Sequence, residues 1–286
     1  MVFIALASTS TIADDAGFRA WGSALSAAFQ ALGLTLRGDA GTINWATVTK
    51  PSLTSAVAGF EVYAFADALQ ATAPIVVKVE YGTGNTATSK SLWITVGTGT
   101  DGAGNVAPMA LIARTQLFSS GTSAIVSPTY VAGDVHWLAF VVDANTSNAS
   151  GFMALIERTH AASGADTPDG VIACGCGYYT QSRFVATGFR SPGEVWREAT
   201  LGALLPSTGS GSTGAQTMVF PVFPAAGPFL NPFQNLLVMF ANNLTAGVPL
   251  SVTHYGAAMT MLPFAQQLTY SVRGAVVGSQ LLLRCA

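Results

Sequence analysis

The stretch PIVVKVEYGTGNTATSKSLWITVGTGTDGAGN, residues 74–105, decides the predicted fold. Apolar or aromatic side chains occupy every second position of residues 75–81, the period of a strand with one buried face and one wetter face. Residues 92–96 alternate again around Trp93, after a loop of Gly, Thr, Asn and Ser. Because the connection is short, the two runs predict an antiparallel hairpin.

A glycine-rich turn ends this hairpin. Gly97, Gly99 and Gly102 have the GxGxxG spacing, which binds dinucleotides when it lies between a strand and a helix. Residues 106–118 contain a proline and no clear helical stripe, and the hairpin lacks a crossover connection. We therefore interpret the turn as a plain loop. With Asp101 as its one acid, it also lacks the oxygen ligands of a calcium site.

Elsewhere, period-two runs outnumber helical ones. The exception is residues 16–32, where Phe18, Trp21 and Leu25 begin a stripe at helical spacing behind a capping aspartate. Residues 1–13 resemble a signal peptide but lack basic residues, so a first strand or arm is expected. A helical turn is expected at residues 66–73. Further strands are expected at 59–65, 109–118, 134–143 and 152–158, with a strand pair at 171–186.

The low-complexity stretch LPSTGSGSTG marks the predicted domain boundary. The expected domains are a helix plus β-sandwich domain at 1–204, a Ser/Gly linker at 205–215 and a C-terminal β assembly region at 216–286. Short strands are predicted in the last region at 218–223, 236–240, 250–255, 268–273 and 279–285, with prolines confining much of it to edges and turns. The fold class is mainly β: an antiparallel, jelly-roll-like β-sandwich with one N-terminal α-helix and a smaller C-terminal β region.

Charge is scarce in this chain of 286 residues. Charged residues are 9% and apolar ones 50% of the sequence, and the formal net charge is −2. No Lys/Arg cluster is present, which argues against a nucleic-acid partner. After Glu198 the fixed side-chain charges are Arg273 and Arg284. An exposed apolar surface of that extent normally marks an interaction site, so we expect neighbouring subunits to cover it. Hydration by Ser, Thr, Asn and Gln is the alternative.

Large apolar residues of the C-terminal region are the expected assembly contacts, because interface cores are enriched in aromatics and Met. They are Phe220, Phe223, Phe229, Phe233, Met239 and Phe240.

The sequence predicts no metal, cofactor or catalytic residue. Cys174 and Cys176 lack the spacing and the histidine partners of a zinc site, and we interpret them as small apolar fillers of a strand; a redox role for them stays open. Glycoside cleavage needs two carboxylates facing one cleft, and no acid is paired by sequence. The five acids on expected strands are Glu61, Glu80, Asp134, Asp143 and Glu157. Four aromatics could stack on sugars or fill the core: Trp93, Trp137, Tyr178 and Tyr179.

Several segments resemble virion structural proteins of tailed bacteriophages. They are FRAW at 18–21, TINW at 42–45, FEVY at 60–63, DAL at 67–69, PIVVKVEYG at 74–82 and VGTGTDGAGN at 96–105. This resemblance covers the first third of the chain; FMALIER at 152–158 and the pattern over 242–284 are less specific. It implies a particle component, often symmetric and multi-copy, and transfers no catalytic residue.

The expected function is therefore a non-enzymatic tail or tail-fibre-associated protein of the virion, assembled in the host cytoplasm. Its expected partners are other virion proteins and further copies of itself, with no membrane insertion. The alternatives are a tail protein that binds a host surface glycan, a head decoration protein, and a tail-associated polysaccharide-degrading enzyme.

Overall fold

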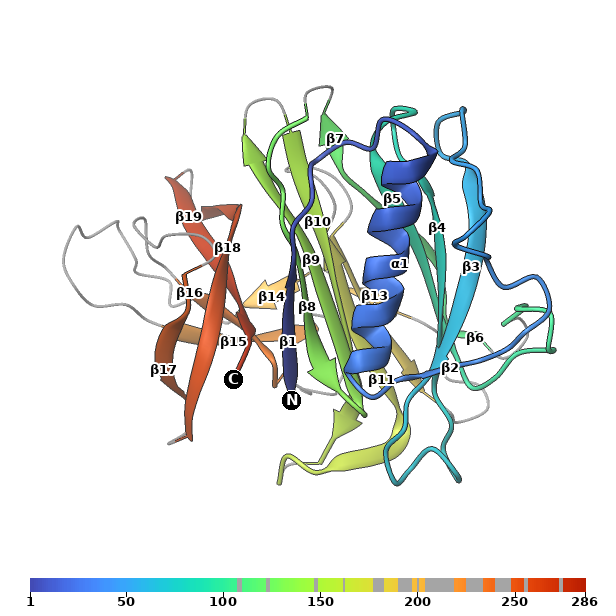
Figure 1. Ribbon diagram of the computed structural model, residues 1–286. Helices are drawn as coiled ribbons and strands as arrows, with labels where there is room; N and C mark the ends of the chain where they lie inside the picture. The colour runs from blue at the N-terminus through green and yellow to red at the C-terminus, as the bar shows by residue number, and fades with distance from the viewer. Residues whose placement is uncertain are drawn as a thin grey trace.

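The computed structural model describes residues 1–106, 110–121, 124–146, 149–161, 163–176, 183–189, 197–199, 201–203, 219–224, 234–239, 248–254, 257–272 and 275–286. Figure 1 shows antiparallel sheets and one long helix. The elements are β1 (Val2–Leu6), α1 (Asp15–Ala31), β2 (Thr35–Leu36), β3 (Val57–Ala64), β4 (Val76–Thr83), β5 (Lys90–Gly97), β6 (Ala110–Phe118), β7 (Ser120–Gly121), β8 (Thr129–Asp134), β9 (Trp137–Thr146), β10 (Ala149–His160), β11 (Asp166–Cys176), β12 (Arg183–Phe189), β13 (Arg197–Ala199), β14 (Leu201–Ala203), β15 (Val219–Pro224), β16 (Leu236–Met239), β17 (Leu250–His254), β18 (Ala257–Val272) and β19 (Ala275–Arg284).

The predicted hairpin is confirmed as β4 and β5, the centre of a five-stranded sheet ordered β2-β3-β4-β5-β6. The strands pair antiparallel, with Val79 opposite Ile94. The predicted wetter face is confirmed on β4, where Lys78 and Glu80 are partly exposed. The alternation does not produce such a face on β5, whose eight residues are all buried. On its outer face the Arg114 guanidinium of β6 lies 5.0 Å from the Trp93 ring and covers it.

The second sheet is eight-stranded, ordered β1-β8-β9-β10-β11-β12-β13, with β7 pairing at β10. The strand predicted at 134–143 is wrong at its start, because Asp134 ends β8 and Trp137 begins β9. The backbone reverses between them, and Asp134 Oδ1 accepts a hydrogen bond from the His136 amide at 3.2 Å. The strand pair predicted at 171–186 is confirmed as β11 and β12.

Helix α1 joins the two sheets. Its N-cap is Asp14, whose Oδ1 accepts a hydrogen bond from the Gly17 amide at 2.8 Å, and Gly33 follows its end with a φ of +95°. Phe29 on its buried face contacts one ring from each sheet: Tyr63 at 5.2 Å and Phe140 at 5.9 Å between centroids. The helix therefore contributes to the core between the sheets, as its position in Figure 1 indicates.

The segment predicted to form a helical turn, 66–73, forms hydrogen-bonded turns without a helix. Its side chains bind neighbouring elements instead. The buried Arg158 guanidinium of β10 forms a two-pronged ion pair with the Asp67 carboxylate and donates to the Ala73 carbonyl at 2.9 Å. Gln70 exchanges two hydrogen bonds with the backbone of Ile75.

The C-terminal sheet is six-stranded, ordered β14-β15-β16-β19-β18-β17. β18 is longer than predicted and continues through Pro263, with a register shift before Gln267. Pro263 lies beyond Met261, the last residue paired with β17, so its missing N–H leaves no bond unmade on that side. The predicted linker at 205–215 lies outside the described residues.

The C-terminal sheet is attached to the eight-stranded sheet of the same chain. β18 lies against β9, and Met261, Leu262 and Leu283 are fully buried. The Glu157 carboxylate of β10 accepts hydrogen bonds from the backbone N–H of Gln234 and from Asn235 Nδ2, both at 2.8 Å. Part of the cover that this region needs therefore comes from its own chain.

The predicted fold class is confirmed: antiparallel sheets dominate, one helix lies near the N-terminus and a smaller sheet follows. Jelly-roll connectivity is not confirmed, because neighbouring strands of the five-stranded and eight-stranded sheets are mostly consecutive in the chain, as in a meander. Within the described residues, no helix is both long and apolar enough to cross a membrane.

Candidate functional site

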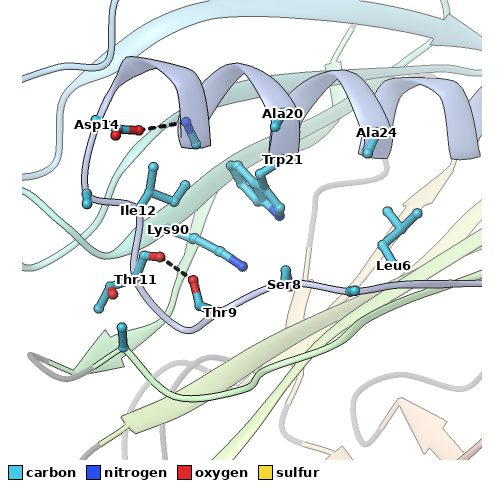
Figure 2. Close-up of a pocket in the computed structure, with 14 residues that line it drawn as sticks. Leu6, Ser8, Thr9, Thr11, Ile12, Asp14, Ala20, Trp21, Ala24 and Lys90 are labelled. Atoms are coloured by element: carbon cyan, nitrogen blue, oxygen red, sulfur yellow. Dashed lines mark hydrogen bonds between the residues drawn. The ribbon is translucent and has the colours of Figure 1, made fainter.

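A cavity of about 360 Å³ lies between the first half of α1, the segment after β1 and the start of β5 (Figure 2). Its walls are mainly apolar or small. They are formed by Leu6, Ala7, Ser8, Thr9, Thr11, Ile12, Ala13, Asp14, Gly17, Ala20, Trp21, Ala24, Lys90 and Ala124. Cavities of this size and composition are at the small end of ligand-binding pockets in proteins.

Lys90 places an amine in this largely apolar setting. It begins β5, two residues before Leu92 and four before Ile94, so the alternation of the strand puts its side chain on the core face with them. Hydrogen bonds between the Lys90 backbone and Ser119 hold this register, at 2.9 Å for the carbonyl and 3.0 Å for the amide. Only 1% of Lys90 is exposed.

The Lys90 amine has no hydrogen-bond partner among the described residues. It lies 5.4 Å from the centroid of the Trp21 ring, and the burial of the amine lowers its pKa to about 7. The indole Nε1 of Trp21 is buried and also lacks a partner within the described part of the chain. Two hydrogen-bond donors at one cavity are therefore unused.

Three other polar side chains of the cavity form hydrogen bonds within the protein. The Ser8 hydroxyl donates to the carbonyl of Ser127, and the Thr9 hydroxyl donates to the carbonyl of Thr11 at 2.7 Å. The Asp14 carboxylate caps α1, as Figure 2 shows at the upper left. Lys90 extends from beside Ile12 into the space between the Trp21 ring and Thr9.

A second cluster surrounds Glu61, one of the acids on a predicted strand. Its carboxylate accepts four hydrogen bonds: from Ser26 Oγ at 2.8 Å, Trp45 Nε1 at 3.0 Å, the Tyr63 hydroxyl at 2.5 Å and the Tyr81 hydroxyl at 2.7 Å. Burial of the Tyr63 hydroxyl is the main cause that raises its pKa, and the nearby Glu61 carboxylate raises it further. Such a saturated anion ties α1 to the five-stranded sheet and has little accepting capacity left for a substrate.

A third cluster lies where β8 meets β9 and β10 meets β11. The Asp166 carboxylate is 3.1 Å from His160 Nδ1 and 3.7 Å from His136 Nδ1, and His160 Nε2 is 3.4 Å from Glu157. Burial disfavours protonation of His160, but its contacts with Glu157 and Asp166 outweigh burial and raise its pKa. No group of three or more such side chains in the described part of the chain has the arrangement of a metal site.

Two of the aromatics considered for sugar stacking, Trp93 and Trp137, are 4% and 2% exposed and belong to the core. Tyr178 and Tyr179 lie outside the described residues. Of the acids considered for catalysis, Glu80 forms an ion pair with Arg114 at 2.5 Å.

Comparison with known proteins does not assign a function: no family model matches the chain, and no curated protein matches it. Sequence reasoning missed Lys90 and the unused indole of Trp21, although Trp21 was correctly predicted to lie on the buried face of α1. The position of Lys90 in the alternation could have revealed its burial, because it shares a face of the strand with Leu92, Ile94 and Val96.

The predicted assembly contacts lie only partly within the described residues. Phe220 and Phe223 belong to β15 and Met239 belongs to β16. These strands are paired, with Phe220 opposite Val238 and Val219 opposite Met239. The remaining three, Phe229, Phe233 and Phe240, lie outside the described residues.

An uncharged edge strand is the clearest surface feature of the described residues. β1, with sequence VFIAL, is the end strand of the eight-stranded sheet and pairs with β8 on one side. None of its five residues is buried. Met1 is 45% and Val2 36% exposed. At the C-terminal sheet, β17 is likewise an end strand, with sequence LSVTH.

Proposed function

We propose that this chain is a non-enzymatic structural subunit of a multi-copy particle, a tail or tail-fibre-associated protein of a tailed bacteriophage virion. The observation that carries the subunit role is the uncharged, partly apolar edge strand β1.

Edge strands present unpaired backbone N–H and C=O groups to any other strand that approaches. Monomeric proteins usually protect such edges with lysine, proline, a bulge or a covering segment. Residues 1–13 contain neither charged side chains nor proline, and every residue of β1 retains exposed area. A strand from a neighbouring subunit can therefore pair with β1 through main-chain hydrogen bonds, with apolar side chains adding contact area.

The C-terminal sheet supports the same role. Its end strand β17 has no Asp, Glu, Lys or Arg, and Ser251 and Thr253 on it are exposed. The lack of acids and lysines after Glu198 leaves this part of the sequence with only two arginines to oppose association. The predicted contacts at Phe220, Phe223 and Met239 belong to strands of this sheet.

The assignment to a phage virion rests on the resemblance of the first third of the chain to such structural proteins. The three alternative functions remain distinct proposals, and no observation on the described residues favours one of them. Mass spectrometry of purified particles tests the assignment. Stoichiometric detection supports it, whereas absence from particles together with turnover of a polysaccharide overturns it.

The subunit role is tested by the mass of the full chain in solution, measured by light scattering over a range of concentrations. Wild type should form a defined oligomer. Ala5→Lys places a charge at an exposed position of β1 and should shift the protein toward monomer. Leu53→Lys is the matched control, because Leu53 is 72% exposed and lies outside any strand. A wild-type monomer at every concentration, or equal association of both variants, would contradict the role assigned to β1.

A further inference from the structure

The cavity beside α1 combines a cation, a neutral donor and an apolar wall. The cation is Lys90 and the neutral donor is the indole N–H of Trp21, and neither has a hydrogen-bond partner among the described residues. Leaving a buried donor without a partner is costly, and a buried amine is more costly than a neutral group. Such groups are rare in native proteins, and a bound ligand or a reaction is one of the reasons for which they are retained.

The charge balance of the cavity limits the ligand to a single negative charge. Of the residues that line the cavity, Lys90 and Asp14 are the two with an acidic or basic side chain. The Asp14 carboxylate remains on the cap of α1, bound to the Gly17 amide at 2.8 Å, and it repels a second negative charge at that end. One cation and one neutral donor match the two oxygens of a carboxylate.

The apolar wall determines the rest of the ligand. Leu6, Ile12, Ala20 and Ala24 line the cavity together with the Trp21 ring. A short hydrocarbon chain fits such a wall, and a volume of about 360 Å³ excludes large molecules.

We propose that this cavity binds a small monocarboxylate with a short apolar body, whose carboxylate oxygens accept hydrogen bonds from Lys90 Nζ and Trp21 Nε1. Both Lys90 Nζ and Trp21 Nε1 are buried without a ligand, so the flexible Lys90 chain must swing and the Trp21 ring must shift toward the cavity to make these contacts. The ligand restores a partner to both donors in one step. This site is independent of the subunit role proposed for β1.

Binding is coupled to a proton. Burial holds the pKa of Lys90 at about 7 in the unliganded protein, so the amine is largely neutral at pH 8. A bound carboxylate favours the charged amine and raises its pKa, so binding at pH 8 takes up a proton from the buffer. Below pH 6 the amine is already charged and binding takes up little.

Isothermal titration calorimetry on the full chain tests the proposal with acetate, butyrate and hexanoate, and with hexanamide as the uncharged match to hexanoate. Wild type should bind hexanoate more tightly than acetate, and hexanamide about tenfold more weakly or worse than hexanoate. Titrations at pH 8 in two buffers of different ionisation enthalpy should show uptake of up to one proton.

Two variants separate the site from nonspecific binding. Lys90→Met keeps the length of the side chain and removes the charge, and it should weaken hexanoate binding by about tenfold or more. Lys78→Met is the control, because Lys78 lies on the same sheet with its amine 4.6 Å from the Phe60 ring and does not line the cavity. It should bind hexanoate as wild type does.

Nuclear magnetic resonance gives a second measurement that needs no variant at Lys90. Hexanoate should shift the indole N–H signal of Trp21, assigned as the signal absent from Trp21→Phe, more than hexanamide does. The proposal is overturned by any of three results: no binding of the three carboxylates to wild type, equal hexanoate binding by Lys90→Met, or an unmoved Trp21 signal at saturating hexanoate.

Discussion

Gly22 on α1 is a position where helix propensity and packing predict opposite effects of one methyl group. A Cβ at this position would lie 1.9 Å and 2.1 Å from two ring carbons of Trp45, whereas ordinary carbon contacts are about 3.5–4.0 Å. Gly22→Ala therefore pushes the Trp45 ring away by more than about 1 Å. The same movement breaks the 3.0 Å hydrogen bond from Trp45 Nε1 to the Glu61 carboxylate.

The expected change in the free energy of unfolding follows from three effects. Overpacking costs about 1–3 kcal/mol, the lost hydrogen bond to a charged group costs about 1.5–3 kcal/mol, and alanine gains about 1 kcal/mol over glycine in a helix. Because Trp45 is only half-buried and can move outward, we expect a net loss of about 2–4 kcal/mol.

Urea unfolding followed by circular dichroism measures this loss. Gly38→Ala is the matched control, because a Cβ at Gly38 has no heavy atom within 4 Å, and it should change stability by no more than about 1 kcal/mol. In a Trp45→Ala background the cost of Gly22→Ala should disappear, because the ring that it contacts is gone. If Gly22→Ala instead stabilises the protein, Trp45 does not pack against Gly22 of α1.

Three further predictions concern buried side chains. Lys90→Met should stabilise the chain most at pH 7 and below, and its advantage over wild type should shrink as pH rises from about 7 toward 10.5. The reason is that burial lowers the pKa of Lys90 in the folded state, so that between these pH values the unfolded wild-type chain binds a proton that the folded chain does not. Urea midpoints at pH 6 and 9 check this. The pKa of His160 is raised in the folded state, so its contacts with Glu157 and Asp166 stabilise that state fully at pH values below the pKa of His160 in the unfolded chain. This stabilisation is lost as pH rises through the pKa of His160 in the folded state. His160→Gln should therefore cost most in acid, and equal losses at pH 5.5 and 8.5 would argue against this ionic role. Trp21→Ala removes a side chain that is 6% exposed and should cost about 3–5 kcal/mol in urea unfolding; a loss below about 1 kcal/mol would place the ring in solvent.

Local periodicity was sufficient to predict the elements near the start of the chain. Helix α1 and the hairpin of β4 and β5 each have a complete pattern and a turn or cap residue at the ends, so the sequence contains all that is needed to place them. The start of β9 was missed because the turn after Asp134 depends on a side chain that accepts from its own backbone, and the surrounding residues continue the apolar pattern.

The cavity was harder to predict than the strands, because its walls come from three separate segments. Lys90 and Trp21 lie far apart in the sequence, and only the packing of α1 on β5 brings them together. The phase of Lys90 within the strand indicates burial, but no pattern in the sequence states that its amine lacks a partner. Likewise, no pattern within β5 indicates that Arg114 of the next strand covers Trp93 on its outer face.

The pairing of β1 with β8 affects the order in which the chain can fold during synthesis. Val2 lies opposite Gly133, so β1 leaves the ribosome long before its partner strand exists. At roughly 5–20 residues per second, synthesis takes on the order of ten seconds to cover that separation. The cap of α1 and the hairpin of β4 and β5 involve only nearby residues and can form within that interval. The nascent β1 is therefore an uncharged segment without its partner strand during this interval, and a chaperone that binds such segments would act on β1 at that stage.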